Sequence, residues 1–375
     1  MHFEIQKFKV HTCVNAAAVD ARCDEALRVG CTMEEPWGDD DRRFMEHALL
    51  VAERGRGRVS PNPMVGCVLV KNGEIIAEGW HDHLGGLHAE QMAIHDAEAK
   101  GRSANGATAY VTLEPCNHFG RTPPCTEALM WAGVRNVIVA HEDPNPTVRG
   151  KGGDVLLANG IPTRFGLMKA EANGQMKGFL HWCEHRRPMV TVKLAVDRNG
   201  SVDDLSANAG RFTSEGCLEK VHELRRDCDA VLVGVNTVVR DDPALTVRRV
   251  PHTRQPLRLV LDPNARTPVD AALLNDEHPT RLLQSDFVSI DRLLNELGDQ
   301  DIQRLLVEGG PTTVKRWLDE QAVDEFLLVV TDVEHQDPVP SGITDEVLEA
   351  AGLRYTESLV WGEEEVRRFL RINAP

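Results

Sequence analysis

The stretch that decides the fold reads WHDHLGGLHAEQMAI over Trp80–Ile94 and, after a short spacer, YVTLEPCNHFGRTPPC over Tyr110–Cys125. Its pattern predicts a helix that opens at His88 and a strand over 108–113. A second helix is predicted to begin at Cys125, directly after two prolines. Strands that alternate with helices indicate an α/β layer fold. In such sheets chemistry gathers where strand ends meet helix starts, so we expect a functional site along this stretch.

Three side chains of this stretch suit a metal ion, namely His88, Cys116 and Cys125. A catalytic zinc site has three protein ligands and one open position for a water, whose pKa the metal lowers to about 7. Glu90 lies two residues after the histidine and can carry a proton from that water to a leaving nitrogen. His-x-Glu followed by Pro-Cys and a later Cys is typical of zinc deaminases. We therefore predict three zinc ligands and Glu90 as the catalytic residue.

Two other interpretations of these residues stay open. A purely structural zinc site usually takes four protein ligands, and two cysteines can also be core residues without any metal. Other histidines are alternative ligands, although a histidine on a loop or helix face is more often solvated or in contact with substrate. These alternatives are His81, His83, His95 and His118.

The chain has 375 residues, which is too long for one ordinary core, so two domains are expected. We predict a poorly ordered leader over 1–38, with a divergent organelle-targeting leader as the alternative. A first domain over 39–183 and a second over 189–375 follow. The charged segment 184–188 ends in proline and is the predicted linker.

The amino-acid composition limits the classes of function that the protein can have. The net charge of −16 argues against a protein that docks broadly on nucleic-acid backbones, where a basic face is expected. The nine cysteines are irregularly spaced, and we find no secretory signal, which indicates a reducing compartment and a cytoplasmic protein. No apolar run approaches about 20 residues, so no membrane span is expected.

The remaining elements follow from apolar periodicity and turn residues. In the first half we predict a helix from Asp39 to Gly55, a hairpin at Asn72-Gly73, a long loop from His141 through Gly153, and a last strand and helix that end near Trp182. The other strands and helices are predicted over 64–70, 74–80, 134–140, 189–197, 214–228, 230–235, 257–261, 304–307, 312–321 and 326–331.

Four motifs together give a more specific resemblance: SPNPMVG, GWHDHLGGLHAE, TLEPCNHFGRTPPC and DPNP. The two cysteines are separated by eight residues, whereas cytidine, tRNA and polynucleotide deaminases have two. From Arg42 to Leu328 the chain resembles the riboflavin-biosynthesis deaminase–reductases. The resemblance implies a cytidine-deaminase-like αβα domain followed by a dihydrofolate-reductase-like α/β domain.

The resemblance also implies an activity. The substrate would be 2,5-diamino-6-(5-phosphoribosylamino)pyrimidin-4(3H)-one, deaminated with Zn²⁺ and then reduced by NADPH from ribose to ribitol. A homo-oligomer, either a dimer or a tetramer, is expected. Asn62 matches an amide that reads the pyrimidine, His81 a further substrate contact, and Arg121 a basic residue beside the ribose phosphate. The alternative for Asn62 is a plain turn residue between two prolines.

The second half contains no GxGxxG motif, so a Rossmann cofactor site is not indicated. Instead, Glu308-Gly309-Gly310 lies between a strand and a helix, where free backbone N–H groups can hold a cofactor phosphate. The run DAVLVGVNTVVRDDPALTVR resembles the family's reductase. That match implies NADPH contacts at Ala195, Thr237, Asp241, Gly310, Pro311 and Thr312, and substrate contacts at Lys193, Arg225, Leu245, Arg248 and Glu308.

Three segments of the second half depart from the family's pattern, and these departures put reduction in question. Asn199 replaces an aspartate, Ala209 a serine and Arg211 a tryptophan, and DVEHQDPVPSG stands where a glycine-rich segment is usual. A deaminase with a degenerate second domain kept as a scaffold is therefore the main alternative. A nucleic-acid base deaminase and a zinc-stabilised interaction module are the others.

Overall fold

The structure is a computed structural model of the full chain and describes residues 37–119, 123–145, 151–206, 212–284 and 289–372. Within it, Asp39–Pro375 forms one compact unit. The predicted leader lies almost entirely outside the described residues, and so do Arg121, Ala209 and Arg211. No described helix is long and apolar enough to cross a membrane.

The first sheet has five strands in the order β2-β1-β3-β4-β5. Strands β1, β2 and β3 pair antiparallel, whereas β3, β4 and β5 are parallel. The strands are β1 (Gly66–Lys71), β2 (Glu74–Trp80), β3 (Thr108–Leu113), β4 (Asn136–His141) and β5 (Thr163–Phe165). The helices are α2 (Asp39–Ala52), with a 3₁₀ turn at Glu53–Gly55, α3 (Ala89–Ala99), α4 (Cys125–Trp131), α5 (Gly152–Ala158) and α6 (Lys169–His185).

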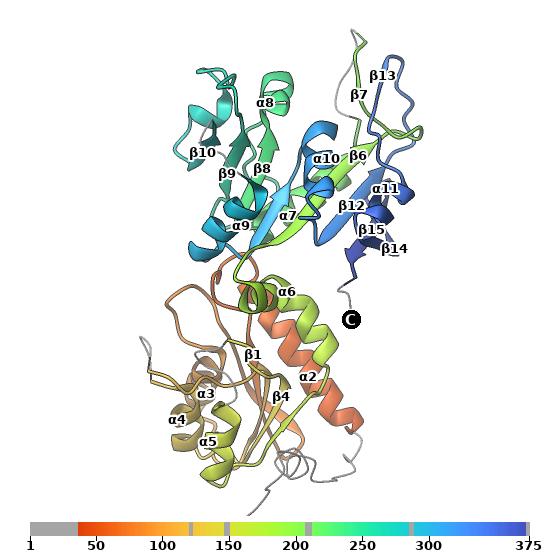
Figure 1. Ribbon diagram of the computed structural model, residues 1–375. Coiled ribbons are helices and arrows are strands. Elements are labelled where there is room, and N and C mark those ends of the chain that lie inside the picture. The colour runs from red at the N-terminus through yellow and green to blue at the C-terminus, as the bar shows by residue number, and fades with distance from the viewer. Residues whose placement is uncertain (1–36, 120–122, 146–150, 207–211, 285–288, 373–375) are drawn as a thin grey trace, which may run out of the picture. The chain divides into compact units, whose positions relative to one another are not determined.

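Helices cover both faces of this sheet. Helices α2 and α6 lie on one face, and α3, α4 and α5 lie on the other (Figure 1). The amphipathic spacing of α2 explains its place, because Phe44, Ala48 and Val51 are all buried. The arrangement is the αβα layering that the family resemblance implies.

The second sheet has eight strands in the order β10-β9-β8-β11-β6-β12-β15-β14, and a small sheet pairs β13 with β7. Strands from β10 to β12 run parallel, and β15 and β14 add antiparallel strands at one edge. The strands are β6 (Met189–Val196), β7 (Ser201–Asp204), β8 (Ala230–Gly234), β9 (Leu257–Leu261), β10 (Thr280–Leu283), β11 (Arg304–Val307), β12 (Glu325–Val330), β13 (Pro338–Pro340), β14 (Leu353–Trp361) and β15 (Glu364–Arg371). The helices are α7 (Glu215–Asp227), α8 (Val235–Asp241), α9 (Ile290–Asp299), α10 (Pro311–Asp319) and α11 (Asp345–Ala350), with a 3₁₀ turn at Ala272–Leu274.

The prediction of a long loop from His141 through Gly153 is wrong in its second part, because helix α5 begins at Gly152. A Cβ atom at Gly152 would lie 2.0 Å from the carbonyl oxygen of Pro115, so the helix approaches that backbone closely. The glycines there permit close packing and do not mark a loop. The strand predicted over 230–235 ends at Gly234, since Val235 already opens α8. Helix α6 continues to His185, through part of the predicted linker.

Candidate active site and metal centre

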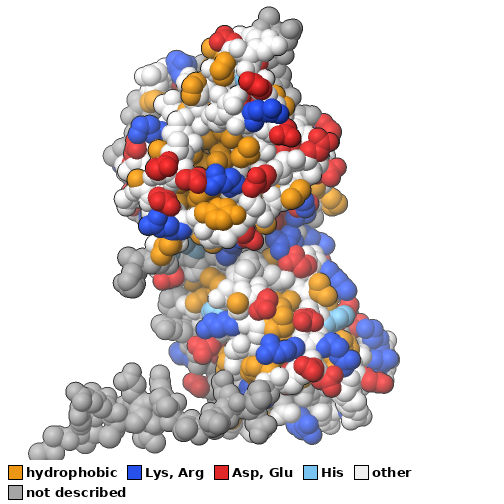
Figure 2. All heavy atoms as spheres, turned by 90° about the vertical axis from the view of Figure 1, so that its right-hand side faces the viewer, with side chains coloured by type: hydrophobic (Ala, Val, Ile, Leu, Met, Phe, Trp, Pro, Cys, Tyr) orange, Lys and Arg blue, Asp and Glu red, His pale blue; other side chains and the backbone are white. Residues whose placement is uncertain are grey.

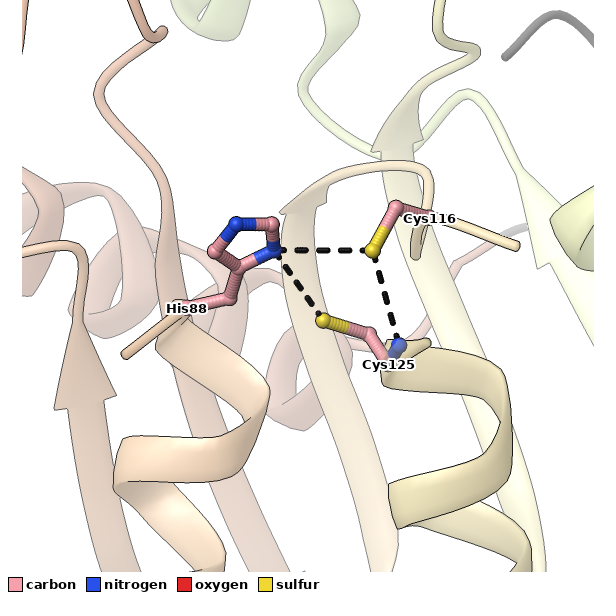
Figure 3. Close-up of side chains that lie close together, drawn as sticks. All are labelled: His88, Cys116 and Cys125. Atoms are coloured by element: carbon pink, nitrogen blue, oxygen red, sulfur yellow. Dashed lines mark hydrogen bonds between the residues drawn. The ribbon is translucent and has the colours of Figure 1, made fainter. Parts of the chain in front are cut away.

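His88, Cys116 and Cys125 lie together in the structure (Figure 3). Their potential ligand atoms all lie within 4.8 Å of one another. The Nδ1 atom of His88 is 3.5 Å from the Cys116 sulfur and 3.3 Å from the Cys125 sulfur. One imidazole nitrogen and two sulfurs are the donor set that zinc prefers, so these residues fit the metal.

The three side chains come from strand–helix junctions. His88 precedes α3, Cys116 follows β3 and Cys125 opens α4. The side-chain amide of Gln91 donates to the carbonyl oxygen of Pro123 at 2.9 Å and so ties the start of α3 to the start of α4. Gly79 on β2 lets α3 approach closely, because a Cβ atom there would lie 2.3 Å from the Ala89 carbonyl oxygen.

The two sulfurs share a hydrogen bond, and it shifts their pKa values in opposite directions. The pKa of Cys116 is lowered to about 4, chiefly because Cys125 donates a hydrogen bond to its sulfur, while burial works against the shift. The same hydrogen bond, together with burial, raises the pKa of Cys125 well above its usual value. Metal ligands bind as thiolates, so a divalent cation would take the place of the proton in that hydrogen bond.

Glu90 lies beside this cluster and is only 3% exposed. Burial raises the pKa of its carboxyl to about 7, and the charge of Cys116 adds to the shift. A carboxyl group with a pKa near neutrality exchanges protons readily in both directions. The arrangement therefore suits a group that takes a proton from water and returns it to a leaving group.

The cluster opens into a cavity of about 470 Å³. Asn62 and His81 line it, and the Asn62 amide nitrogen is 3.0 Å from Nε2 of His81. Since an amide N–H can only donate, Nε2 accepts, and Nδ1 of His81 donates to the Leu87 carbonyl oxygen at 2.9 Å. Burial lowers the pKa of His81, which favours this neutral form. Asn62 thus has a fixed orientation and keeps its carbonyl oxygen for other donors.

Asp143 also lines the cavity, although no role was predicted for it beyond membership of the DPNP motif. It is 7% exposed, and burial raises its pKa to about 6. Glu114 holds this loop, because its carboxylate accepts the backbone N–H groups of Asp143 and Gly153 at 3.1 and 3.0 Å. A polar residue directly after β4 was the available signal, since strand ends gather at one edge of a parallel sheet.

The residues predicted to bind cofactor and the second substrate lie around the carboxyl ends of three adjacent parallel strands, β6, β11 and β8. Lys193 and Ala195 are on β6, Thr237 and Asp241 on α8 after β8, and Glu308 with Gly310, Pro311 and Thr312 between β11 and α10. Arg225 lies on α7, and Leu245 and Arg248 lie in the segment after α8.

Arg225 and Glu308 form a two-pronged ion pair, with distances of 2.6 Å from Nε and 3.0 Å from Nη2 to the two carboxylate oxygens. Burial alone would raise the pKa of Glu308, but the guanidinium outweighs it and keeps that pKa below the usual value. Arg248 is exposed, and its backbone N–H donates to Nδ1 of His222 at 3.1 Å. Asn199 is exposed in the turn between β6 and β7.

Comparisons with known proteins agree with both halves. Residues 38–141 match the family model of the cytidine and deoxycytidylate deaminase zinc-binding region, and residues 188–332 match the RibD C-terminal domain. The riboflavin biosynthesis protein RibD of Aquifex aeolicus is 40% identical over 310 residues, which cover 77% of this chain and 86% of that protein. RibD of Escherichia coli is 38% identical over 322 residues, which cover 77% and 87%.

Solved structures agree as well. A diaminohydroxyphosphoribosylaminopyrimidine deaminase/5-amino-6-(5-phosphoribosylamino)uracil reductase from Thermotoga maritima superposes with a TM-score of 0.82 at 32% identity, covering 89% of this chain and 99% of that one. RibD of Acinetobacter baumannii gives a TM-score of 0.79 at 34% identity, with coverage of 89% and 99%.

The predicted fold class is confirmed: a cytidine-deaminase-like domain is followed by a reductase domain. The predicted enzyme class and cofactors are confirmed as well, namely a zinc-dependent deaminase joined to an NADPH-dependent reductase. Both domains are present, so the two-activity reading holds over the deaminase-only alternative. The chain belongs to the RibD family of riboflavin biosynthesis enzymes.

Proposed function

We propose that this enzyme deaminates 2,5-diamino-6-(5-phosphoribosylamino)pyrimidin-4(3H)-one and then reduces the ribose of the product to ribitol with NADPH. One observation carries the proposal: His88, Cys116 and Cys125 meet beside buried Glu90 at a cavity large enough for a pyrimidine nucleotide. The name of the Thermotoga maritima relative describes the same two reactions.

In the deamination, His88, Cys116 and Cys125 would hold zinc, which acidifies a water when bound. Glu90 removes a proton from that water and delivers it to the departing amine. The water oxygen replaces the exocyclic nitrogen on the ring carbon, and ammonia leaves. Glu90 can serve both steps because its pKa of about 7 lets it hold or release the proton near neutral pH.

Asn62 and Asp143 would read the pyrimidine, and His81 is proposed as a further contact of the substrate. All three residues line the cavity. Asn62 offers its carbonyl oxygen to an N–H of the base, since its amide nitrogen is already bound to His81. Asp143 accepts a hydrogen bond when ionised and donates one when protonated, so its pKa of about 6 suits a diaminopyrimidine edge. Arg121 is proposed to contact the phosphate, as a guanidinium suits that group.

In the reduction, NADPH supplies the hydride. The backbone N–H groups of Gly310 and Thr312 at the start of α10 would hold a cofactor phosphate. Pro311 has no N–H and is proposed as a packing contact of the cofactor, with further contacts from Ala195, Thr237 and Asp241. Lys193 on β6 is proposed to lie beside the reacting ribose. Arg225 and Arg248 are proposed to bind the sugar phosphate, as guanidinium groups suit phosphate. Glu308, which holds Arg225 in place, and Leu245 are proposed as further contacts of the substrate.

We further propose domain boundaries at 39–183 and 189–375, a cytoplasmic location and assembly as a homo-oligomer. The separate sheets support the boundaries. A small-molecule substrate and no nucleic acid are proposed as partners. The net charge of −16 supports this, and basic and acidic side chains lie interspersed on the face shown in Figure 2.

The experiment supplies the diaminopyrimidine phosphate with and without NADPH and identifies the products. Ammonia release without NADPH, followed by a ribitol product when NADPH is added, is the expected result. Absence of ammonia would refute the proposed substrate. Ammonia without any ribitol product would refute the proposed reduction.

A further inference from the structure

The cavity beside the metal cluster is not lined by the deaminase domain alone. Asp301 and Gln303, which precede β11 of the reductase domain, contribute to its wall. The deaminase side of the same region is the loop Ser60–Pro63, which carries Asn62. The binding cavity is thus completed by a segment distant in sequence, within the compact unit that both domains form.

Two hydrogen bonds from the reductase domain hold this loop immediately before Asn62. The Ser60 hydroxyl donates to a carboxylate oxygen of Asp229 at 2.5 Å. The side-chain amide of Gln303 donates to the carbonyl oxygen of Pro61 at 2.5 Å. The two residues that precede Asn62 are therefore both fixed by side chains of the other domain.

Asp229 is a buried hydrogen-bond acceptor with several partners. It is 5% exposed, and its second carboxylate oxygen accepts the backbone N–H groups of Gln303 and Arg304, each at 2.9 Å. Arg254 donates to the first oxygen at 2.6 Å, the oxygen that also receives Ser60. One buried carboxylate thus fixes the start of β11 and the loop of the deaminase at once, and charge-assisted bonds of this kind are the stronger ones.

We propose that Asp229 and Gln303 are positioning residues of the deaminase, which hold Asn62 in register with the cavity so that the reductase domain is a structural part of the deamination site. The inference rests on the proposed role of Asn62 in reading the pyrimidine. Ser60 is the sharpest probe, because it does not line the large cavity and can act on substrate only through the loop.

The test compares Ser60→Ala and Ser60→Thr in the full-length, zinc-loaded enzyme. Loss of one hydrogen bond to a buried carboxylate should raise the deaminase KM about tenfold, while kcat and zinc content stay unchanged. Threonine keeps the hydroxyl and should restore most of the affinity. Gln303→Met, which keeps the length of the side chain but not its donor, should also raise the KM.

Arg56→Gln is the matched control. Arg56 pairs with Asp227 at 2.9 Å, and this ion pair joins the same two domains without involving a side chain of Ser60–Pro63. This variant should leave the deaminase KM unchanged, and in all variants the KM for reduction of the deaminated substrate should stay the same. An equal KM rise in Arg56→Gln, or a rise that follows zinc loss, would show a general structural effect and overturn the proposal.

A readout independent of substrate separates this inference from the proposed function. Amide hydrogen exchange of a peptide covering residues 59–66 should become faster in Ser60→Ala than in the wild type, with Ser60→Thr close to wild type. If wild-type enzyme releases no ammonia from the diaminopyrimidine, the proposed substrate fails, and the exchange result still decides whether Asp229 holds the loop. Unchanged exchange in Ser60→Ala would overturn the inference.

Discussion

The pKa values of poorly exposed carboxyl groups shift in opposite directions in the two domains. In the deaminase cavity, burial raises the pKa of Glu90 to about 7 and that of Asp143 to about 6. In the reductase domain, burial is outweighed by cations: Arg225 keeps the pKa of Glu308 below its usual value, and Lys177 lowers that of Glu325 to about 2.

The difference matches the two chemistries. Deamination moves protons between water and a leaving amine, so carboxyl groups with pKa values near neutral pH are useful. In the reduction, NADPH supplies the hydride, and the protein binds and orients the charged groups of cofactor and substrate. At the reductase site, the carboxylate of Glu308 paired with Arg225 gives a fixed charge for that purpose.

Metal removal tests the comparison most strongly. Dialysis against a chelator should abolish ammonia release, because bound zinc is the group proposed to acidify the attacking water. NADPH oxidation with the deaminated substrate should continue, since none of the proposed reductase contacts is a zinc ligand. Added zinc should restore deamination. Deamination by metal-free protein would contradict the zinc assignment.

Glu90→Gln tests the proton-transfer side of the comparison. Glutamine keeps the shape but cannot carry a proton, so deaminase kcat should fall by about 10²- to 10⁴-fold. Zinc content, measured by metal analysis, and reductase kinetics should be unchanged. Full deaminase turnover by a zinc-replete variant would remove Glu90 from the mechanism.

Arg225→Met tests the role of the fixed charge in the reductase domain. The variant leaves the carboxylate of Glu308, whose side chain is only 11% exposed, without its partner. This should destabilise the protein by about 3 kcal/mol in urea unfolding and abolish reduction. The double variant Arg225→Met/Glu308→Met removes the unpaired charge, so stability should recover while reduction stays absent. Recovery of reduction in the double variant would show that the ion pair serves folding alone.

Acidification should remove the stabilising effect of the second ion-paired carboxylate, Glu325. Lys177 and Arg368 bind it at 2.8 and 2.9 Å, and its folded-state pKa of about 2 lies below its ordinary value. A depressed carboxyl pKa stabilises the fold above about pH 4.5, and this contribution of about 3 kcal/mol is lost as the pH falls toward 2. Unfolding free energies at pH 7 and pH 3 should therefore differ less in Glu325→Gln than in wild type. Equal acid sensitivity of the two proteins would contradict this.

Asn199→Asp should have the smallest effect. The residue is exposed, and exposed substitutions away from special backbone features usually change free energies by less than about 0.5 kcal/mol. We expect the KM for NADPH to change by less than about threefold, as measured by initial rates of NADPH oxidation. A tenfold gain would mean that the family's aspartate contacts the cofactor and that its loss weakens this reductase.

The metal cluster could be predicted because its three ligands lie within 38 residues of sequence. Each ligand also lies at a junction of a strand and a helix, which the local apolar periodicity and the turn residues indicate. The α/β layering followed from the same patterns. Helix α5 was missed because Gly152 is required by packing against Pro115, which no local pattern reveals. Strand β14 was missed because most of its residues are exposed at a sheet edge and lack an apolar alternation.

The contacts of Asp229 and Gln303 with the deaminase loop could not be predicted either. They join residues 169 and 242 positions apart, and their partners are a hydroxyl and a backbone carbonyl, which leave no signature in the sequence. Asp143 was visible within its motif, but its place in the cavity depends on Glu114.

The close approach of Gly152 to Pro115 has a consequence for anyone who wishes to redesign this enzyme. Pro115 is bonded to the ligand Cys116, so any larger side chain at 152 would push on the backbone that sets the sulfur. In a saturation mutagenesis screen for growth without added vitamin, position 152 should therefore tolerate as few substitutions as Cys116. A residue without any functional group would then rank among the most constrained in the chain.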